Sequence, residues 1–337
     1  CTINIIIFRD LYQNLSTRLH TVAQMWSKEA EEVFLAGDPL QTLYPFWGSD
    51  PAYFLDWEGD LKVLPVSRRL PQNVWKIAGD LIEWCTPYRV PEIETKSEDA
   101  WIDIIDHDNL YGWLLSTPKN KNSTVFHLVR TKYTGLEVAR TLYSLGIPFG
   151  GIWEYAWNKQ SCYLYNAVLS VRLGSSISYS EFRALLDLYP EIDLISNTGC
   201  TKSEYLDMIH NGCAIPSLRA FDEKFLQLLR ADDPFESLPL TPLAKEKFMG
   251  ALRRKVPKIE YKDIKVYLLT IHGAKGMEAD TVFLHTAITP AIKTAMFTQK
   301  ERENEAYVWY VGITRTKSNI FFVTYTGKNY PIPGICS

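Results

Sequence analysis

The sequence predicts an α/β protein built on a parallel sheet and interrupted by a helical insertion. Three observations indicate this fold class: short apolar runs typical of buried strands, helical patterns between them, and a long stretch with helical patterns alone. Of the 337 residues, 46% are hydrophobic and 22% are charged, so the chain can bury large cores. This composition excludes a disordered or collagen-like protein.

The first strand–helix–strand unit lies at the start of the chain. Ile3–Phe8 is apolar except at Asn4, as in a fully buried strand of a parallel sheet. A helix is expected over Ser16–Lys28, and a second apolar strand over Val33–Ala36. Binding loops of parallel α/β units lie at the carboxyl ends of the strands, so the segment after Val33–Ala36 is a candidate binding loop.

A second α/β pattern begins near Leu61 and returns after the insertion. Its expected strands are Val63–Val66, Val125–Val129, Val266–Thr270, Thr281–His285 and Ile320–Thr324, and its expected helices are Gln72–Trp84 and Thr134–Leu145. Between Trp157 and Lys262 the pattern is helical. Helices are expected there at Tyr179–Leu188, Lys202–His210, Arg219–Arg230 and Pro242–Arg253.

Net charge and cysteine spacing argue against several classes of protein. With 36 basic and 39 acidic residues the net charge is -3, so any nucleic-acid site must be local. The six cysteines are far apart and include no Cys-x-x-Cys, which argues against a disulfide framework or zinc site and favours a reducing, intracellular setting. No apolar run reaches the roughly 18 residues of a membrane span. Because Cys1 almost directly precedes a strand, we expect further sequence upstream.

Two segments at expected strand ends carry candidate binding chemistry. Gly37–Gly48 is a polar loop followed by three aromatic residues in four positions, a pattern that suits phosphate sensing beside a base-stacking platform. Ser67–Pro71 contains two arginines that can clamp phosphate. Taken singly, the first is better explained as a turn followed by core aromatics, and the second as a solvated surface pair.

Two further segments lie near the C-terminus. Thr270–Glu278 has glycines that let a backbone approach phosphate, with His272 and Lys275 as donors. Tyr310–Lys317 places Arg315 at the end of an expected helix, where it can reach a nucleotide held by a neighbouring domain. The plain alternatives are a strand-to-strand turn and a basic helix end that complements the helix dipole.

In this order and spacing, the four segments resemble motifs III, IV, V and VI of the UvrD/Rep/PcrA-type helicases of superfamily 1. Thr270–Glu278 matches Thr-x-His-x-x-Lys-Gly-x-Glu of motif V, and Val311–Lys317 matches Val-x-x-Thr-Arg-x-Lys of motif VI. The resemblance implies a RecA-like, P-loop NTPase-type motor domain with a helical insertion, plus a remnant of a first RecA-like domain. The domain boundaries it implies are 1–58 for the remnant, 59–155 and 263–337 for the two parts of the second motor domain, and 156–262 for the insertion.

The resemblance also implies roles for individual residues. Nucleotide sensing at the γ-phosphate is implied for Gln41, Arg69 and Arg315, further nucleotide contacts for Gly276 and Glu278, and Mg²⁺ and nucleotide contacts for Asp10 and Gln13. Single-stranded DNA is implied to stack on Tyr44, Phe46 and Trp47 and to pass Thr270 and His272. The cofactors would be ATP and Mg²⁺, and movement would usually run 3′ to 5′.

Two departures from the family pattern concern ATP hydrolysis, and a third concerns motif IV. The phosphate-cradling Gly-x-x-x-x-Gly-Lys-[Ser/Thr] loop does not occur in this sequence. Motif II, Asp-Glu-x-Gln-Asp, aligns best with Asp10–Asn14, so Leu11 takes the place of the glutamate that orients water, and Asn14 that of the second aspartate. In motif IV, Arg68 replaces the aromatic residue expected to stack on adenine.

Three functions remain open on these residues. The chain is the C-terminal part of an ATP-dependent DNA helicase, needing a phosphate-loop half that a separate polypeptide could carry. Alternatively it is a degenerate, ATPase-inactive module that binds DNA or acts as a scaffold, which Leu11 favours. A nuclease-associated or structural α/β protein is the third, and motifs V and VI argue against it. For either helicase-related function, the expected location is cytoplasmic or nucleoid-associated.

Overall fold

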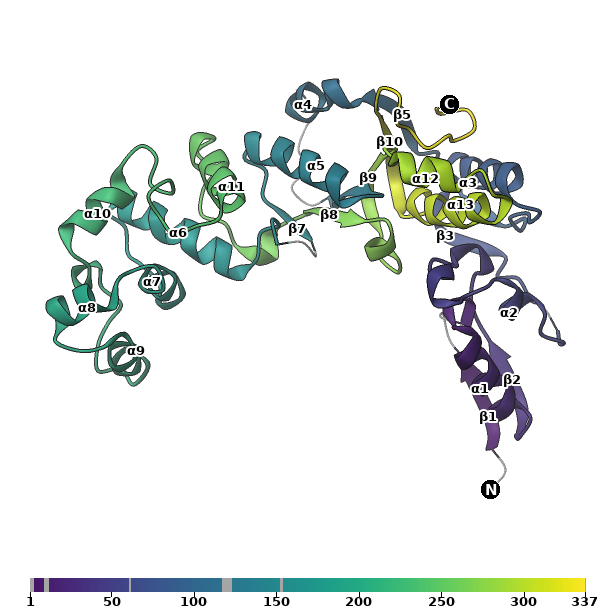
Figure 1. Cartoon of the computed structure of the whole chain (residues 1–337), viewed down its shortest axis with the longest axis horizontal. Helices are drawn as coiled ribbons and strands as arrows, with labels where there is room; N and C mark the ends of the chain where they lie inside the picture. Colours follow the sequence, from purple (N-terminus) through teal and green to yellow (C-terminus); the bar gives the residue numbers. More distant parts are fainter. Residues whose placement is uncertain (1–2, 9–11, 61, 117–122, 152–153, 337) are drawn as a thin grey trace. The chain divides into compact units, whose positions relative to one another are not determined.

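A computed structural model describes residues 3–8, 12–60, 62–116, 123–151 and 154–336 (Figure 1). In this described part, one six-stranded sheet has the strand order β5-β10-β9-β6-β8-β7, and β1-β2 and β3-β4 form two smaller sheets. The chain divides into two compact units, residues 1–135 with 269–337, and residues 136–268. The predicted α/β class with a parallel sheet is therefore confirmed.

Parallel pairing dominates the large sheet. Its strands are β5 (Trp101–Asp106), β6 (Val125–Val129), β7 (Phe149–Gly151), β8 (Val266–Thr270), β9 (Ala279–His285) and β10 (Thr316–Thr324). The pairs β5–β10, β10–β9, β9–β6 and β7–β8 are all parallel. Parallel sheets are buried on both faces, which explains the near-continuous apolar runs of β6, β9 and β10.

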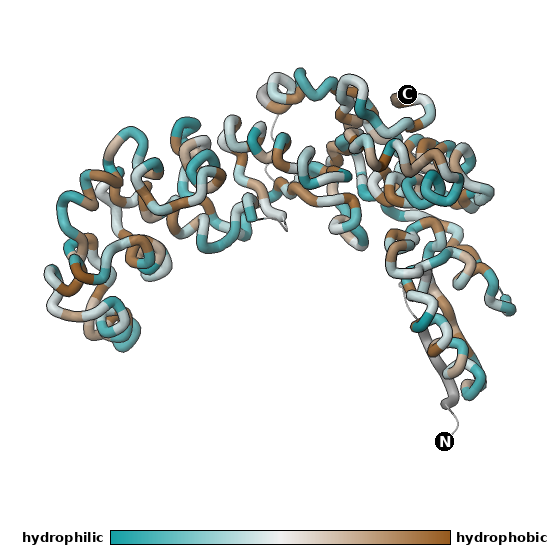
Figure 2. The backbone as a smooth tube through the Cα atoms, viewed as in Figure 1, coloured by the Kyte–Doolittle hydropathy of each residue, from teal (hydrophilic) through white to brown (hydrophobic). Residues whose placement is uncertain are grey.

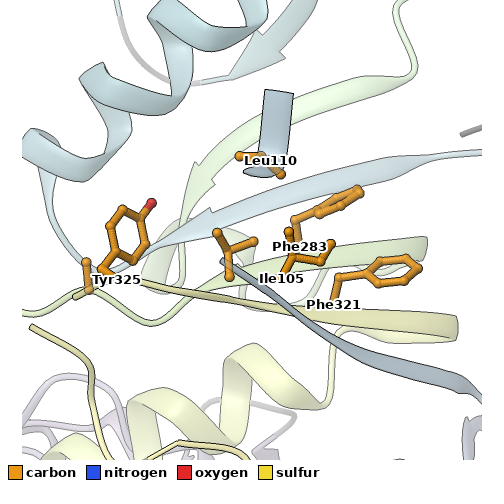
Figure 3. Packing of buried hydrophobic residues seen from close by; sticks show 7 residues of the cluster. Ile105, Leu110, Phe283, Phe321 and Tyr325 are labelled. Carbon is orange, nitrogen blue, oxygen red and sulfur yellow. The ribbon is translucent and has the colours of Figure 1, made fainter. Parts of the chain in front are cut away.

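The core of the first unit joins this sheet to a helix that precedes β6. Ile105 on β5, Phe283 on β9 and Phe321 on β10 pack with Leu110 of α4 (His107–Ser116), as Figure 3 shows. Tyr325, just after β10, closes the cluster. Elsewhere in the unit, α13 (Gln299–Ile313) packs against α3 (Gln72–Cys85), and residues 305–313 of α13 are all buried. Its second half is apolar on all sides apart from Glu305, which is typical of such a buried position, whereas its first half is polar and largely exposed.

The predicted first strand–helix–strand unit is confirmed. Strands β1 (Ile3–Phe8) and β2 (Ala30–Leu35) pair in parallel, and α1 (Thr17–Ser27) connects them. Ser16 caps α1 by accepting a hydrogen bond from the Leu19 amide. The predicted burial of Ile3–Phe8 concerns side chains outside the described residues, whereas β2 is half exposed. Apolar and polar segments alternate along α1 (Figure 2).

The strand predicted at Val63–Val66 is wrong. Strand β3 runs from Val66 to Pro71 and pairs in parallel with β4 (Glu94–Lys96). Pro65 has no N–H to donate and restricts the residue before it, so the strand begins only after it, and its register with β4 shifts between Val66 and Pro71. As a consequence, Arg68 and Arg69 lie within a strand and on opposite faces of it, rather than in the loop that follows.

The segment between β7 and β8, in the second unit, is largely helical. Its helices are α6 (Lys159–Leu173), α7 (Tyr179–Leu186), α8 (Glu191–Thr198), α9 (Lys202–His210), α10 (Glu223–Arg230) and α11 (Pro242–Arg253). The predicted bounds of α9 and α11 are confirmed, since Thr201 and Thr241 cap their first turns. The helix predicted from Arg219 begins only at Glu223, because Asp222 provides its N-cap.

The remaining helices are α2 (Ala52–Leu55), α5 (Lys132–Ser144) and α12 (Pro290–Ala295). Cys85, Cys162, Cys200, Cys213 and Cys336, the cysteines in the described part, are all free thiols. None of the described helices combines the length and the apolar character that crossing a bilayer requires.

Candidate functional site

The loop after β2 is organised around one carboxylate. Asp38 caps the short 3₁₀ helix Pro39–Gln41, and its Oδ1 accepts a hydrogen bond from the Leu40 amide at 3.0 Å. Its Oδ2 accepts a second hydrogen bond from Gln41 Nε2 at 2.8 Å. Leu40 is buried and anchors the turn. The side-chain amide of Gln41 is therefore oriented, with its nitrogen toward Asp38 and its oxygen free to face a donor.

Arg315 supplies that donor from the C-terminal part of the chain. It lies two residues beyond α13 and is 2% exposed. Its Nε donates to the Val311 carbonyl at 2.9 Å, and its Nη2 lies 3.4 Å from Gln41 Oε1. Burial, with a contribution from nearby Arg69, lowers the pKa of Arg315 to about 10, so the guanidinium stays charged at neutral pH. A buried cation thus faces the Gln41 amide oxygen.

Two more residues from the C-terminal segments hold the same loop. Lys275 Nζ donates to the backbone oxygen of Gln41 at 2.5 Å, and the Tyr310 hydroxyl donates to Asp38 Oδ2 at 3.3 Å. Burial lowers the pKa of Lys275 to about 8, while the Asp38 carboxylate acts in the opposite direction. Gln41 is thereby fixed through both its side chain and its backbone by groups far away in the sequence.

Arg69 and Glu278 form an ion pair at the edge of this cluster. Their Nη1 and Oε2 atoms are 3.8 Å apart, and the side chains are 31% and 49% exposed. The buried Nε of Arg69 has no hydrogen-bond partner within the described part of the chain. Native proteins seldom leave a buried donor unpaired, so this N–H fits a site for an anionic ligand oxygen. Three cations, Arg69, Lys275 and Arg315, face two carboxylates here, which suits a polyphosphate.

An exposed aromatic surface follows on the same loop. Phe46 and Trp47 are 68% and 67% exposed, and the Tyr44 and Trp47 rings stack with centroids 5.1 Å apart and planes 16° apart. Phe46 contacts both rings edge-on, at 5.9 and 5.2 Å. Large aromatic side chains at this exposure cost free energy unless a partner covers them. The alternative of a turn followed by core aromatics does not fit the exposures of Phe46 and Trp47.

His272 borders the aromatic surface. Its ring centroid lies 6.2 Å from that of Tyr44. Burial, followed by the positive charge of Arg130, lowers the pKa of His272 to about 4, so the imidazole is neutral at physiological pH. Thr270 Oγ1 accepts a hydrogen bond from the Gly273 amide at 3.0 Å, which stabilises the turn after β8. Gly276 has a φ of +80°, a left-handed conformation that glycine adopts without the steric cost of a Cβ, so glycine is the residue that this turn favours.

The remaining predicted site residues are Asp10 and Gln13, whose side chains lie outside the described part of the structure. Asp10, predicted to bind Mg²⁺, and Leu11 lie outside the described residues, and Gln13 lies in the 3₁₀ helix Tyr12–Asn14, where its side chain is not described. No cluster of three or more potential metal ligands occurs among the described residues. For ATP, by contrast, the unpaired Arg69 Nε and the adjacent cations fit the phosphate groups.

Sequence reasoning missed the part played by Tyr310 and Asp38. Both stand inside segments that the motifs singled out, but a tyrosine in a helix buried all round is typical of core packing. Nothing in the local pattern indicated that its hydroxyl reaches Asp38. That contact depends on how α13 packs against the loop, which no local pattern contains.

Comparisons with known proteins relate the sequence to DNA helicases. Residues 223–327 match the family model of the UvrD-like helicase C-terminal domain. The chain is 21% identical over 397 aligned positions to the ATP-dependent DNA helicase PcrA of Bacillus subtilis (strain 168), covering 93% of this chain and 54% of PcrA. It is 28% identical over 117 residues to the ATP-dependent DNA helicase Rep of Buchnera aphidicola subsp. Schizaphis graminum (strain Sg), covering 32% of this chain and 18% of Rep.

The chain thus spans about half the length of PcrA and less of Rep. These matches confirm the resemblance inferred from motifs III to VI: the chain is similar to the C-terminal portion of UvrD-like superfamily 1 helicases.

Proposed function

We propose that this chain is the C-terminal part of an ATP-dependent DNA helicase that couples ATP hydrolysis to 3′–5′ movement on single-stranded DNA. One observation carries the proposal: Gln41, on the loop that leads into the aromatic surface, contacts Arg315 and Lys275 from the C-terminal motifs. An intracellular location, in the cytoplasm or on the nucleoid, follows from this activity.

The chemistry of this contact supports coupling between nucleotide and DNA. Arg315 and Arg69 are proposed to meet the γ-phosphate, and Gly276 and Glu278 the nucleotide beside it, while Asp10 and Gln13 serve Mg²⁺. Bound ATP would supply phosphate oxygens that compete with Gln41 Oε1 for the Arg315 guanidinium. Because Tyr44 follows Gln41 by three residues, a change at Gln41 would displace the aromatic surface.

The aromatic surface is proposed to stack on single-stranded bases, with Thr270 and His272 beside the strand's backbone. Trp47→Ala is expected to weaken binding of a labelled oligo-dT about five-fold or more, because stacking contributes roughly 1–3 kcal/mol per base. Its melting temperature should stay close to that of the unmodified chain, since Trp47 is largely exposed. Fluorescence anisotropy and thermal unfolding on the same preparation measure both quantities.

Trp84→Ala is the matched control, because Trp84 is 56% exposed and lies on α3, away from the loop. It should leave oligo-dT affinity unchanged. Equal reductions of affinity in the two variants, or a lower melting temperature with unchanged affinity in Trp47→Ala, would contradict the stacking role.

A phosphate-loop-bearing α/β partner is also part of the proposal. Four apolar side chains on α1 are between 38% and 62% exposed: Leu19, Val22, Met25 and Trp26. Beside them, the described β1–β2 sheet has two strands, and Phe34 of β2 is exposed. Parallel sheets are normally covered on both faces, so this surface fits further α/β structure, on the same or a separate polypeptide.

ATP turnover distinguishes this proposal from the ATPase-inactive module that Leu11 favours. Alone, this chain is expected to hydrolyse ATP no faster than a buffer blank, because its sequence has no phosphate-cradling loop. Adding a polypeptide with that loop should restore turnover stimulated by single-stranded DNA, and Arg315→Ala should abolish it. DNA binding without turnover under those conditions would favour the inactive module.

A further inference from the structure

The second unit contains a groove between α5 and α11 that neither the nucleotide cluster nor the aromatic surface uses. Its volume is about 800 Å³. The two helices approach closely because α11 has no side chain at Gly250, where a Cβ would clash with the backbone oxygen of Tyr143 on α5. At the end of α11, Arg254 Nε donates to the Ser144 carbonyl at 3.0 Å, so the carboxyl ends of both helices meet at the groove.

Basic side chains line this α5–α11 groove. They are Arg140 from α5 and Lys245, Arg253 and Arg254 from α11, while Glu236 and Glu246 supply the acidic groups of the lining. Arg140 pairs with Glu246 at 3.2 Å, and Arg253 pairs with Asp233 at 3.5 Å. All four side chains in these pairs are 44% to 70% exposed. Such exposed pairs are weak and exchange readily for another anion.

The spacing of the cations matches an extended anion. Lys245 and Arg253 are eight residues apart on α11, a rise of about 12 Å along the helix. Phosphates of one DNA strand follow each other about every 3.4 Å along the axis, so this row spans about three or four of them. A single phosphate would occupy only one end. Tyr143, the aromatic residue of the wall, is buried and offers no stacking face.

The backbone at the end of α11 adds a second, independent observation. Lys255 has a φ of +53°, the left-handed conformation that glycine or asparagine usually adopts after a helix. A lysine there is strained relative to glycine. Its exposed ammonium extends the basic run Arg253-Arg254-Lys255 beside the groove. Retaining a cation at a position where glycine would be more stable is consistent with a binding role.

We infer that the α5–α11 groove binds the sugar–phosphate backbone of a nucleic acid, without base stacking, as a second contact distinct from the aromatic surface. This inference rests on the proposed DNA-binding function. The contact is electrostatic, so it contributes to affinity mainly through released counterions. It therefore predicts a strong salt dependence that the net charge of -3 for the whole chain does not suggest.

The test compares two triple variants of the full chain that remove the same amount of charge. The groove variant is Arg253→Gln/Arg254→Gln/Lys255→Gln, and the control is Lys159→Gln/Lys224→Gln/Lys265→Gln, three exposed lysines of the same unit outside the groove lining. Affinity for a short labelled duplex, and for one of its strands alone, is measured across a salt series. Removing one cation that neutralises a phosphate reduces the steepness of log K against log salt by about 0.9 for duplex and about 0.7 for a single strand.

We expect the slope of the groove variant to be shallower by about two and that of the control by less than about 0.5. Slopes that fall equally in both variants, or in neither, would overturn the inference. The duplex and single-strand arms show which form of nucleic acid the groove prefers. If the unmodified chain binds neither oligonucleotide, the proposed function fails as well; if it binds and the groove variant keeps its full slope, only the groove inference fails.

Lys255→Gly separates binding from helix capping. It removes one cation and the unfavourable φ together, so the melting temperature should be unchanged or up to about 3 °C higher while the salt slope falls by about 0.9. If the basic run only caps α11, the slope will not change, and that result would overturn the inference.

Discussion

Arg130→Met is expected to lower the free energy of unfolding of the first unit by about 3–5 kcal/mol. Arg130 directly follows β6 and reaches Glu305 on α13, where its Nε and Nη2 donate to the carboxylate at 3.0 and 2.5 Å. The two side chains are only 23% and 10% exposed. Removing the cation leaves the Glu305 carboxylate desolvated without the charge that compensates it, which is the costly case for a buried pair.

The control is the same substitution at an exposed ion pair. Arg140→Met removes the partner of Glu246, and these side chains are 58% and 44% exposed, so a decrease of about 1 kcal/mol or less is expected. Hydrogen exchange followed through a urea series reports the stability of each unit, in peptides from β6 and α13 for Arg130→Met and in peptides from α11 for Arg140→Met. Arg130→Met/Glu305→Leu should recover much of the stability, because it removes both buried charges. A decrease in Arg130→Met no larger than in Arg140→Met would refute the buried-pair argument.

Elements with their own start and stop signals were predictable from sequence. Helices α9 and α11 were predicted with the observed bounds, because Thr201 and Thr241 cap them and each has a regular apolar stripe. Strand β8 was predicted at Val266–Thr270, as observed. The signals that specify these elements lie within a few residues of each element, so local sequence alone is sufficient to predict them.

Elements specified by their neighbours were not predictable in the same way. Helix α6 was missed because its sequence is apolar nearly all round and its hydrophobic periodicity is weak. Strand β5 was missed because it is an edge strand, in which Asp103 and Asp106 interrupt the apolar run and remain exposed. Burial selects the helical conformation of α6, and pairing with β10 selects the strand conformation of β5, rather than a local pattern.

The same distinction between local pattern and tertiary packing applies to the candidate site. The motifs indicated that Gln41 and Arg315 serve one ligand, and the structure places Arg315 Nη2 3.4 Å from Gln41 Oε1. The supports of that contact, Tyr310 on Asp38 and Lys275 on the Gln41 carbonyl, depend on how three distant segments pack. Motifs select residue types for a ligand, while the hydrogen bonds that orient those residues are set by tertiary packing.

A buried histidine pair in the large sheet could not be predicted either, because it depends on strand register. His127 on β6 and His285 on β9 are 1% and 0% exposed, and His127 Nδ1 lies 3.1 Å from His285 Nε2. His285 Nδ1 in turn lies 2.8 Å from the Tyr325 hydroxyl. His127 also stacks on Phe283, with ring centroids 4.6 Å apart. The contact between the two imidazoles accommodates one N–H, so the two rings cannot both be charged, and complete burial favours the neutral form of each.

Acidification from pH 6.5 to 5 is therefore expected to destabilise the first unit by about 3 kcal/mol. Burial lowers the pKa of His127 to about 3, and burial together with His127 and His107 lowers the pKa of His285 well below its usual value. Below about pH 6.5 the unfolded chain binds a proton at each histidine, whereas in the folded chain His127 does not until near pH 3 and the pKa of His285 is also well below its usual value. Stability is thus fully present above about pH 6.5 and falls by about 1.4 kcal/mol per pH unit for each histidine.

The pH slope, measured by urea unfolding with hydrogen exchange at β6 and β9, distinguishes the pair from other titrating groups. His20 and His272 also have lowered pKa values and add to the slope with the same sign. His127→Phe removes one titrating group while keeping a ring against Phe283, so it should reduce the slope by about 1.4 kcal/mol per pH unit, whatever its effect on stability at neutral pH. A slope in His127→Phe equal to that of the unmodified chain would show that His127 binds a proton in the folded state, contrary to the neutral form that its burial favours.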